Sequence, residues 1–87
     1  MRIIYTDDFN HNLQKFPKKI RRFLAIQEVR FKINWRDNRL HIKKIRSLDR
    51  VFSLRITRRY RTFFYFQNQE TAIFFDFDHR KDAYKSI

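Results

Sequence analysis

The sequence contains no cysteine and no glycine, and it has a single proline. The absence of cysteine excludes disulfides and thiolate metal sites. The absence of glycine excludes every glycine-rich phosphate-binding loop, and turns must instead use residues such as Asn, Asp and Ser. The three histidines are scattered without the spacing of metal ligands, so we expect neither a metal nor another cofactor.

Long apolar runs are also missing, since none approaches the roughly 20 residues that cross a bilayer. The N-terminal stretch MRIIYTDDF is too short and too charged for a signal peptide. We therefore expect a soluble cytoplasmic protein. Its 87 residues, 43% of them hydrophobic, predict a single domain over residues 1–87 with one small core.

Positive charge is in large excess. The chain has 21 Lys and Arg residues against nine Asp and Glu, which gives a net charge of +12. Between Arg36 and Arg61 there are ten basic residues and two acidic ones. Such a concentration is typical of proteins that bind a polyanion, which could be nucleic acid, an acidic protein or a membrane surface.

The N-terminal half predicts one strand followed by two helices. RIIYT is typical of a short strand, and Thr6 can cap a first helix that runs to about Phe16. Pro17 interrupts the pattern and is suited to open a second helix, from Lys18 to about Asn34.

The second predicted helix carries apolar residues on two nearly opposite sides. One side has the periodicity of a core face. The other contains Ile26, Val29 and Ile33. This second stripe could pack against the first helix or the C-terminal tail, or it could form a groove for a partner helix or strand.

The C-terminal half predicts a small sheet. Residues 35–50 are highly charged and weakly periodic, so we expect a loop there. Three strands should follow as an antiparallel meander, because only short turns join them: Val51–Thr57, Tyr60–Phe66 and Thr71–Phe77. The predicted fold class is α+β, with an N-terminal strand, two helices and this meander, and with the helices on one face of the sheet.

Side-chain alternation predicts that the other face of the sheet is polar. Arg55 and Arg61 would lie on that face. In the last strand, strict alternation puts Ile73, Phe75 and Phe77 on one face of the sheet. It puts Phe74, Asp76 and Asp78 on the other.

Basic side chains on and around this face could bind phosphate groups. Arg55 and Arg61 are costly in strands rich in Phe unless water or an anion partners them. Each basic residue taken singly could equally be a solvated surface side chain. Together they suggest a surface that binds nucleic acid through its phosphates, which gives affinity but little sequence specificity. The predicted contacts come from Lys43, Lys44, Arg46, Arg55, Arg58 and Arg59.

Three further candidates follow the last predicted strand. His79 can exchange a proton near neutral pH, although a lone histidine is often structural or exposed. Arg80 could meet an anion, and Tyr84 could stack on a base.

At this point the motifs resemble the RelE/ParE superfamily of toxins from bacterial toxin–antitoxin modules. The resemblance is carried by FSLRITRRYRTFFYF and FFDFDHRKDAYKSI, with RLHIKKIRSLDR upstream of them. In that family an arginine lies near the middle of one strand, Tyr-Arg opens the next, and the final strand ends near His-Arg before a Tyr. The resemblance also covers the order of one strand, two helices and three strands.

The resemblance implies two alternative activities. RelE-like members are ribosome-dependent endoribonucleases that cut messenger RNA in the decoding site without a metal. They use the ribose 2′-hydroxyl as nucleophile and leave a 2′,3′-cyclic phosphate. ParE-like members share the fold but inhibit DNA gyrase. A third reading, from the charge alone, is a non-catalytic nucleic-acid-binding module. For either toxin, an acidic antitoxin is the implied protein partner, with no membrane partner.

The resemblance also implies roles for individual residues. Arg61 corresponds to the arginine that contacts the scissile phosphate, and Arg80 to the one that stabilises charge there. Tyr84 falls near the tyrosine that orients or deprotonates the reacting nucleotide. Arg55 occupies a basic strand position, and His79 matches a histidine of some subfamilies.

Two positions depart from the family pattern. Many relatives have glycine where this chain has Asp78, and the preceding turn often has glycine where this chain has Arg59. An aspartate at position 78 would favour the imidazolium form of His79 and could pair with Arg80.

Overall fold

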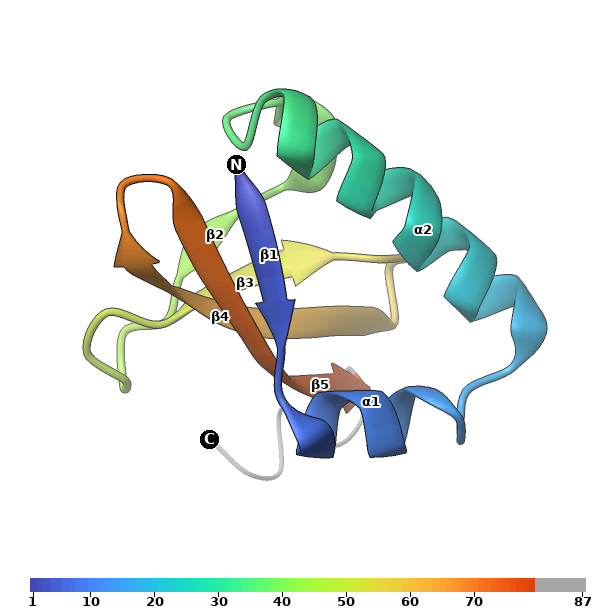
Figure 1. Ribbon diagram of the computed structural model, residues 1–87. Coiled ribbons are helices and arrows are strands. Elements are labelled where there is room, and N and C mark those ends of the chain that lie inside the picture. The colour runs from blue at the N-terminus through green and yellow to red at the C-terminus, as the bar shows by residue number, and fades with distance from the viewer. Residues whose placement is uncertain (80–87) are drawn as a thin grey trace.

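The computed structural model describes residues 1–79, and of His79 it describes only the backbone. It contains one five-stranded sheet in the strand order β1-β5-β4-β3-β2, with two α-helices and one 3-10 helix (Figure 1). The elements are β1 Arg2–Tyr5, α1 Asp7–Leu13, α2 Lys18–Ile33, η1 Asn38–Leu40, β2 Lys43–Lys44, β3 Phe52–Arg55, β4 Tyr60–Asn68 and β5 Thr71–His79.

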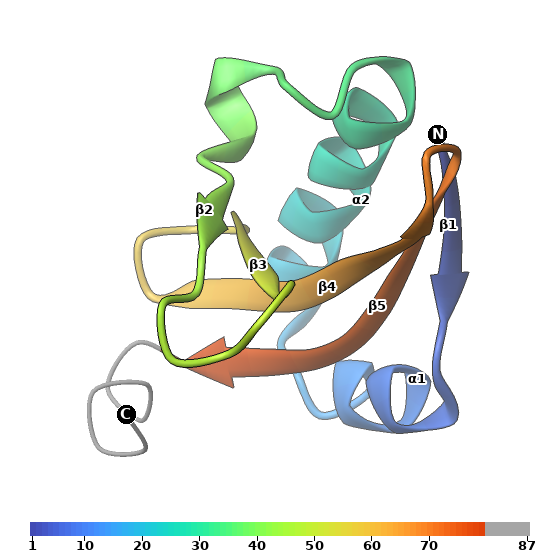
Figure 2. The same cartoon turned by 90° about the vertical axis from the view of Figure 1, so that its left-hand side faces the viewer.

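The predicted α+β class is confirmed, and so is the antiparallel meander of β3, β4 and β5. The sheet is nevertheless mixed, because β1 pairs with β5 in parallel. The loop predicted for residues 35–50 was wrong in part, since it contains η1 and β2. Strand β2 has only two residues, which is too short to produce a periodic pattern, and it adds a fifth strand beside β3 (Figure 2).

Helix α1 begins as predicted and ends earlier. Thr6 caps it, because the Phe9 amide donates to the Thr6 hydroxyl oxygen at 3.1 Å. The helix ends at Leu13, three residues before the predicted end at Phe16. A proline disfavours helical geometry in the residue that precedes it, and Pro17 follows Phe16 directly.

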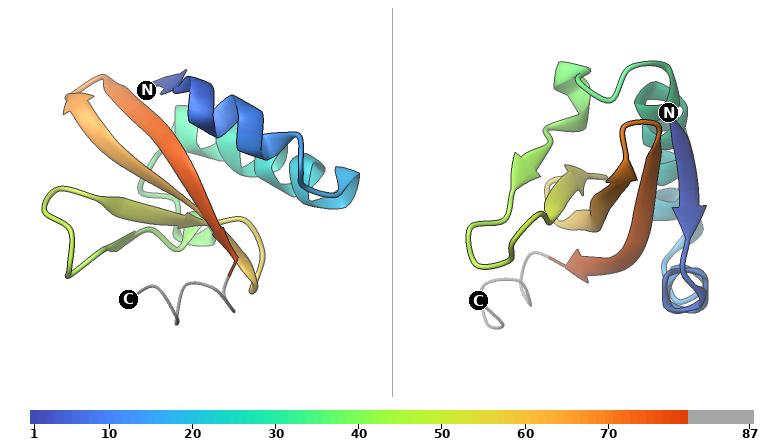
Figure 3. Two further views of the ribbon diagram at one scale, coloured as in Figure 1. Left: turned by 90° about the horizontal axis from the view of Figure 1, so that it is seen from below. Right: turned by 60° about the vertical axis from the view of Figure 1, so that its left-hand side comes forward.

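Both α-helices lie on the same side of the sheet, as predicted (Figure 3). The core between the layers is aromatic, with Phe9, Phe31, Phe64 and Phe74 at most 1% exposed. The ring of Phe31, on α2, meets the rings of Phe64 and Phe74 edge-on at 5.2 and 5.3 Å. This edge-to-face geometry, which suits aromatic quadrupoles, docks α2 on the centre of the sheet.

Strict alternation in β5 was a wrong prediction. Phe63 pairs with Asp76, whereas the next residue, Phe64, pairs with Phe74, so Phe75 is an extra residue in the ladder. A bulge of this kind shifts the alternation by one position. As a result Phe74 and Phe77 both face the core, where Phe77 contacts Phe9 at 4.2 Å between ring centroids. Phe75 instead lies over Phe63.

Two positions have a left-handed backbone that would suit glycine. His41 has φ 46° and Arg50 has φ 62°, and all other described residues have negative φ. We expected Asn, Asp and Ser to serve such turns. Since a side chain larger than hydrogen disfavours this region by about 1–2 kcal/mol, the absence of glycine leaves strain on both sides of β2.

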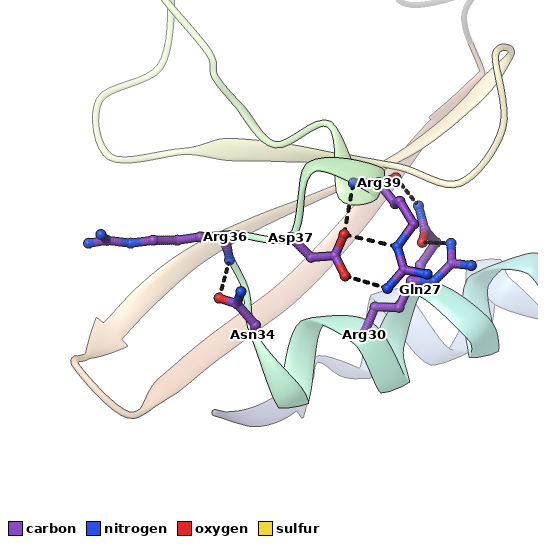
Figure 4. Close-up of polar contacts among 6 residues, drawn as sticks. All are labelled: Gln27, Arg30, Asn34, Arg36, Asp37 and Arg39. Atoms are coloured by element: carbon purple, nitrogen blue, oxygen red, sulfur yellow. Dashed lines mark hydrogen bonds and ion pairs between the residues drawn. The ribbon is translucent and has the colours of Figure 1, made fainter.

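A buried glutamine joins three elements. Gln27 of α2 donates from Nε2 to the carbonyl oxygens of Arg39 and Arg55, at 2.9 and 2.8 Å. Its Oε1 accepts from Arg30 at 3.0 Å (Figure 4). Asp37 holds Arg39 by a bidentate pair, and that pair lowers the pKa of Asp37 to about 2. Gln27 therefore links α2 to η1 and to the end of β3.

We predict that Gln27→Glu lowers the free energy of unfolding by about 2–4 kcal/mol, because a carboxylate would face two carbonyl oxygens that now accept hydrogen bonds. Urea denaturation measures the change. Gln67→Glu, at an exposed position of β4, is the matched control and should change stability by less than about 0.5 kcal/mol. Equal effects of the two substitutions would contradict the linking role of Gln27.

Candidate nucleic-acid interface

Two predicted arginines lie directly opposite one another on the open face, which is the face of the sheet away from α1 and α2. Arg55 at the end of β3 pairs with Arg61 near the start of β4. Directly opposed residues have Cβ atoms about 4.5–5.5 Å apart, and like charges at that distance repel. Both residues are half-buried, so solvent weakens this repulsion only in part. The pair therefore favours an anion.

One carboxylate lies beside this pair. Asp78 on β5 is the cross-strand partner of Arg61, and its Oδ2 lies 3.7 Å from the Arg61 Nη2. The predicted pairing of Asp78 with Arg80 stays a prediction, because Arg80 lies outside the described residues; within them Asp78 pairs with Arg61. The Nε of Arg61 is buried and has no hydrogen-bond partner within residues 1–79. Two guanidinium groups and one carboxylate leave one positive charge in excess.

The two lysines of β2 point to opposite sides of the sheet. Lys43 pairs with Ser53, and Ser53 pairs with Phe63, which is on the same face as Arg61. Lys44 pairs with Phe52, whose ring packs on the core residue Phe64 at 5.7 Å. Lys43 therefore belongs with the arginine pair, and Lys44 does not.

The remaining basic candidates lie in exposed turns. Arg46 follows β2 in the loop to β3. Arg58 and Arg59 form the turn between β3 and β4, and this turn is closed by hydrogen bonds from the Ile56 and Thr57 amides to the Tyr60 carbonyl, at 2.9 and 3.1 Å. This turn continues from the strand ends that carry Arg55 and Arg61, so it borders the arginine pair.

The three candidates at the C-terminal end are only partly described. The backbone of His79 pairs with Tyr60, the residue before Arg61, at the same end of the sheet as the arginine pair. Arg80 and Tyr84 lie outside the described residues. The positions of their side chains, and that of His79, are therefore predictions from the sequence and the resemblance.

Aromatic side chains also lie on the open face, and alternation in β4 correctly places two of them, Phe63 and Tyr65, on the face of Arg61. Phe63 and Tyr65 on β4 lie beside Phe75 on β5, with ring centroids 6.4 Å apart for Phe63–Phe75 and 5.8 Å for Tyr65–Phe75. The guanidinium carbon of Arg61 is 5.1 Å from the Phe63 centroid, within cation–π range. The predicted polar face is thus an arginine pair next to three rings.

Helix α2 presents a second surface away from the sheet. Ile26, Val29 and Ile33 are 48%, 58% and 81% exposed, so this stripe does not pack against α1. A pocket of about 310 Å³, the α2 pocket, adjoins the stripe between α2, η1 and β3. It is lined by Phe23, Ile26, Gln27, Arg30, Arg39, His41, Arg55 and Ile56.

The described residues contain no group of three or more His, Cys, Asp or Glu side chains that could hold a metal ion. Neither α1 nor α2, the α-helices of residues 1–79, has the length and apolarity of a membrane span. The groups on the open face that can contact a ligand are the guanidinium groups of Arg55 and Arg61 and the three aromatic rings.

No family model and no curated protein matches the sequence. Solved structures do match it. A chain of the RelB–RelE antitoxin–toxin complex of Methanococcus jannaschii is 24% identical, with a TM-score of 0.76 over 97% of this chain and 98% of that chain. The RelE–RelB complex of Pyrococcus horikoshii OT3 gives 17% identity and a TM-score of 0.67, over 91% and 93%.

The toxin–antitoxin complex RelBE2 of Mycobacterium tuberculosis gives 26% identity and a TM-score of 0.63, over 91% of this chain and 96% of that chain. The chain thus has the RelE-like toxin fold, and the fold implied by the resemblance is confirmed.

We predict that Asp78→Asn destabilises the fold by about 0.5–1 kcal/mol, because Arg61 loses a partly buried counter-charge. The same change should tighten binding of single-stranded RNA about threefold at low salt, since it increases the positive charge of the open face. Urea denaturation and fluorescence anisotropy measure the two effects.

Asp49→Asn is the matched control. It removes the same charge from a loop where Asp49 is 88% exposed and lies 3.9 Å from Arg50. It should leave stability unchanged and alter RNA binding less than Asp78→Asn does. An equal gain of affinity in the two variants would mean that net charge, and not the arginine pair, governs binding.

Proposed function

We propose that this protein is the toxin of a type II toxin–antitoxin module and that it cleaves messenger RNA on the ribosome without a metal. The observation that carries the proposal is the juxtaposition of Arg55 and Arg61 on the open face of a RelE-like toxin fold. The solved complexes that share this fold are toxin–antitoxin complexes, which supports a toxin role. The excess positive charge supports an RNA phosphate as the ligand.

The proposed reaction is a transesterification. The ribose 2′-hydroxyl loses its proton and its oxygen bonds to the adjacent phosphorus, while the bond to the 5′-oxygen breaks and that oxygen takes up a proton. Arg61 and Arg80 offset the negative charge that develops on the phosphate oxygens. His79 and Tyr84 are the candidates for the two proton transfers, and the ribosome holds the RNA in line for attack.

Arg61→Ala should lower the cleavage rate about 10²–10³-fold, the usual effect of losing one preorganised donor. Arg80→Ala should act in the same direction. The measurement is the mapping of new RNA 5′ ends after induced expression, where the native chain should cut within translated codons. Arg36→Ala is the matched control, because the Arg36 guanidinium lies over Trp35, at 5.0 Å, and not in the arginine pair.

The rival toxin activity has a different outcome in this experiment. Inhibition of DNA gyrase on the same fold would produce DNA breaks with no new RNA ends, and it would not depend on Arg80. Undiminished growth arrest in both arginine variants would exclude the proposed site. Tight RNA binding with neither cuts nor growth arrest would favour a non-catalytic binding module.

We also propose that an acidic antitoxin binds the exposed surface of α2 and the adjoining basic residues. The stripe of Ile26, Val29 and Ile33 offers apolar contacts at helical spacing. The α2 pocket beside it has Arg30 and Arg39 in its lining, which complement an acidic segment.

Val29→Glu should weaken co-purification with a small acidic protein encoded beside this chain by at least tenfold, because a carboxylate would interrupt the stripe and repel an acidic partner. Growth arrest by the toxin alone should persist. Gln67→Glu adds the same charge at an exposed site on β4 and should leave the complex intact. Normal neutralisation of the Val29→Glu toxin would show that the antitoxin binds elsewhere.

A further inference from the structure

Three aromatic side chains form a continuous strip on the open face. Phe63 and Phe75 lie nearly parallel, with 27° between their ring planes, and Tyr65 is inclined to Phe75 by 49°. At the β5 bulge Asp76 is the residue paired with Phe63, and the ring of the extra residue, Phe75, lies over Phe63. The strip therefore spans the two central strands β4 and β5 of the open face.

These rings differ from the core rings on the other side of the same strands. Phe64 and Phe74 are fully buried, whereas Tyr65 is 39% exposed and Phe63 and Phe75 are half-buried. Neither helix covers them, since α1 and α2 pack on the opposite face. Exposed apolar surface of this kind commonly marks a binding site.

Charge on the two sides of the strip is unequal. Lys43 and Arg55 lie on β2 and β3, on one side of the strip, and Asp76 and Asp78 lie on β5, on the other side, whereas Arg61 stands on β4 at the end of the strip. A polyanionic backbone is attracted to the first side and repelled from the second. A chain with charged phosphates along one edge and flat apolar groups along the other matches this pattern.

We propose that Phe63, Phe75 and Tyr65 form a stacking platform for unpaired bases of single-stranded RNA, with the sugar–phosphate backbone on the side of Arg55 and Arg61. The inference rests on the proposed RNA substrate and extends it to the bases. Sheet-face aromatic side chains are an established means of holding unpaired bases. Because every base has a π-face, the platform binds many sequences, and each stacked base contributes about tenfold or more to affinity.

The spacing along the strands fits this arrangement. Arg61, Phe63 and Tyr65 are successive open-face residues of β4, and such residues are about 7 Å apart. The Arg61 guanidinium also lies against the Phe63 ring, so it can contact a phosphate while its flat side remains on the platform. One strand thus carries the phosphate contact and the first stacking contact.

The test compares Phe75→Leu and Tyr65→Leu with the native full-length chain. Leucine keeps an apolar side chain and removes the π-face, so thermal unfolding should show that both variants fold. The probe is a labelled 2′-O-methyl oligonucleotide, which lacks the nucleophilic hydroxyl, and a matched oligonucleotide of the same length with abasic sites. Fluorescence anisotropy gives both affinities over a range of salt concentrations.

The native chain should bind the complete oligonucleotide about tenfold more tightly than the abasic one, and each leucine variant should lose most of this difference. The salt dependence should remain unchanged in the leucine variants, because the phosphate contacts persist. In Arg55→Ala it should fall by about 0.7 in the log–log slope, the value for one lost phosphate contact on a single strand.

A tryptophan at the platform gives an independent signal. The single native tryptophan, Trp35, packs against Phe66 with centroids 5.0 Å apart. In Trp35→Phe combined with Tyr65→Trp, the new indole should be quenched when the complete oligonucleotide binds and unaffected by the abasic one. Equal quenching by both oligonucleotides would overturn the platform.

The outcomes separate this inference from the proposed function. If the leucine variants bind RNA normally while Arg61→Ala abolishes cleavage, the platform is wrong and the nuclease proposal stands. If the platform signals appear but induced cells show no RNA cuts, base stacking stands and the nuclease proposal fails. Loss of antitoxin binding or of self-association in the leucine variants, with unchanged RNA affinity, would assign the strip to a protein partner.

Discussion

The architecture of the open face depends on the direct cross-strand pairing of Arg55 with Arg61. Two guanidinium groups opposed across β3 and β4 repel each other, and Asp78 compensates only one of them. A sheet face that existed only for stability would avoid this arrangement, since an aliphatic or opposite-charge pair is more favourable. The arrangement therefore leaves excess positive charge at the end of the sheet where β5 ends at His79, and a bound anion would neutralise it.

Aromatic side chains lie on both faces of the sheet. On the inner face, Phe31, Phe64 and Phe74 pack edge-on and stacked to hold α2. On the open face, the ring of Phe75 on β5 lies beside Phe63 on β4. Because Gln27 ties α2 to the carbonyl of Arg55, the inner packing also fixes the strand that presents the charge.

Much of the fold was predictable because its elements are long enough to show periodicity, as for α2 and the meander. The position of Arg55 and Arg61 on one face followed from alternation. Strand β2 could not be predicted, since two residues carry no period. The bulge at Phe75 was also missed, because an extra residue in a ladder depends on the partner strand and not on local sequence. The roles of Arg80 and Tyr84 remain predictions.

The most direct measurement is a solution NMR titration of the isolated protein with a dinucleotide that contains one phosphodiester. If the arginine pair is an anion site next to a base platform, the largest shifts should occur at the Arg61 Nε–H signal, at the Arg55 side chain and at the ring of Phe63. Shifts confined to arginines of α2 and η1, with Arg55 and Arg61 unmoved, would contradict the central claim.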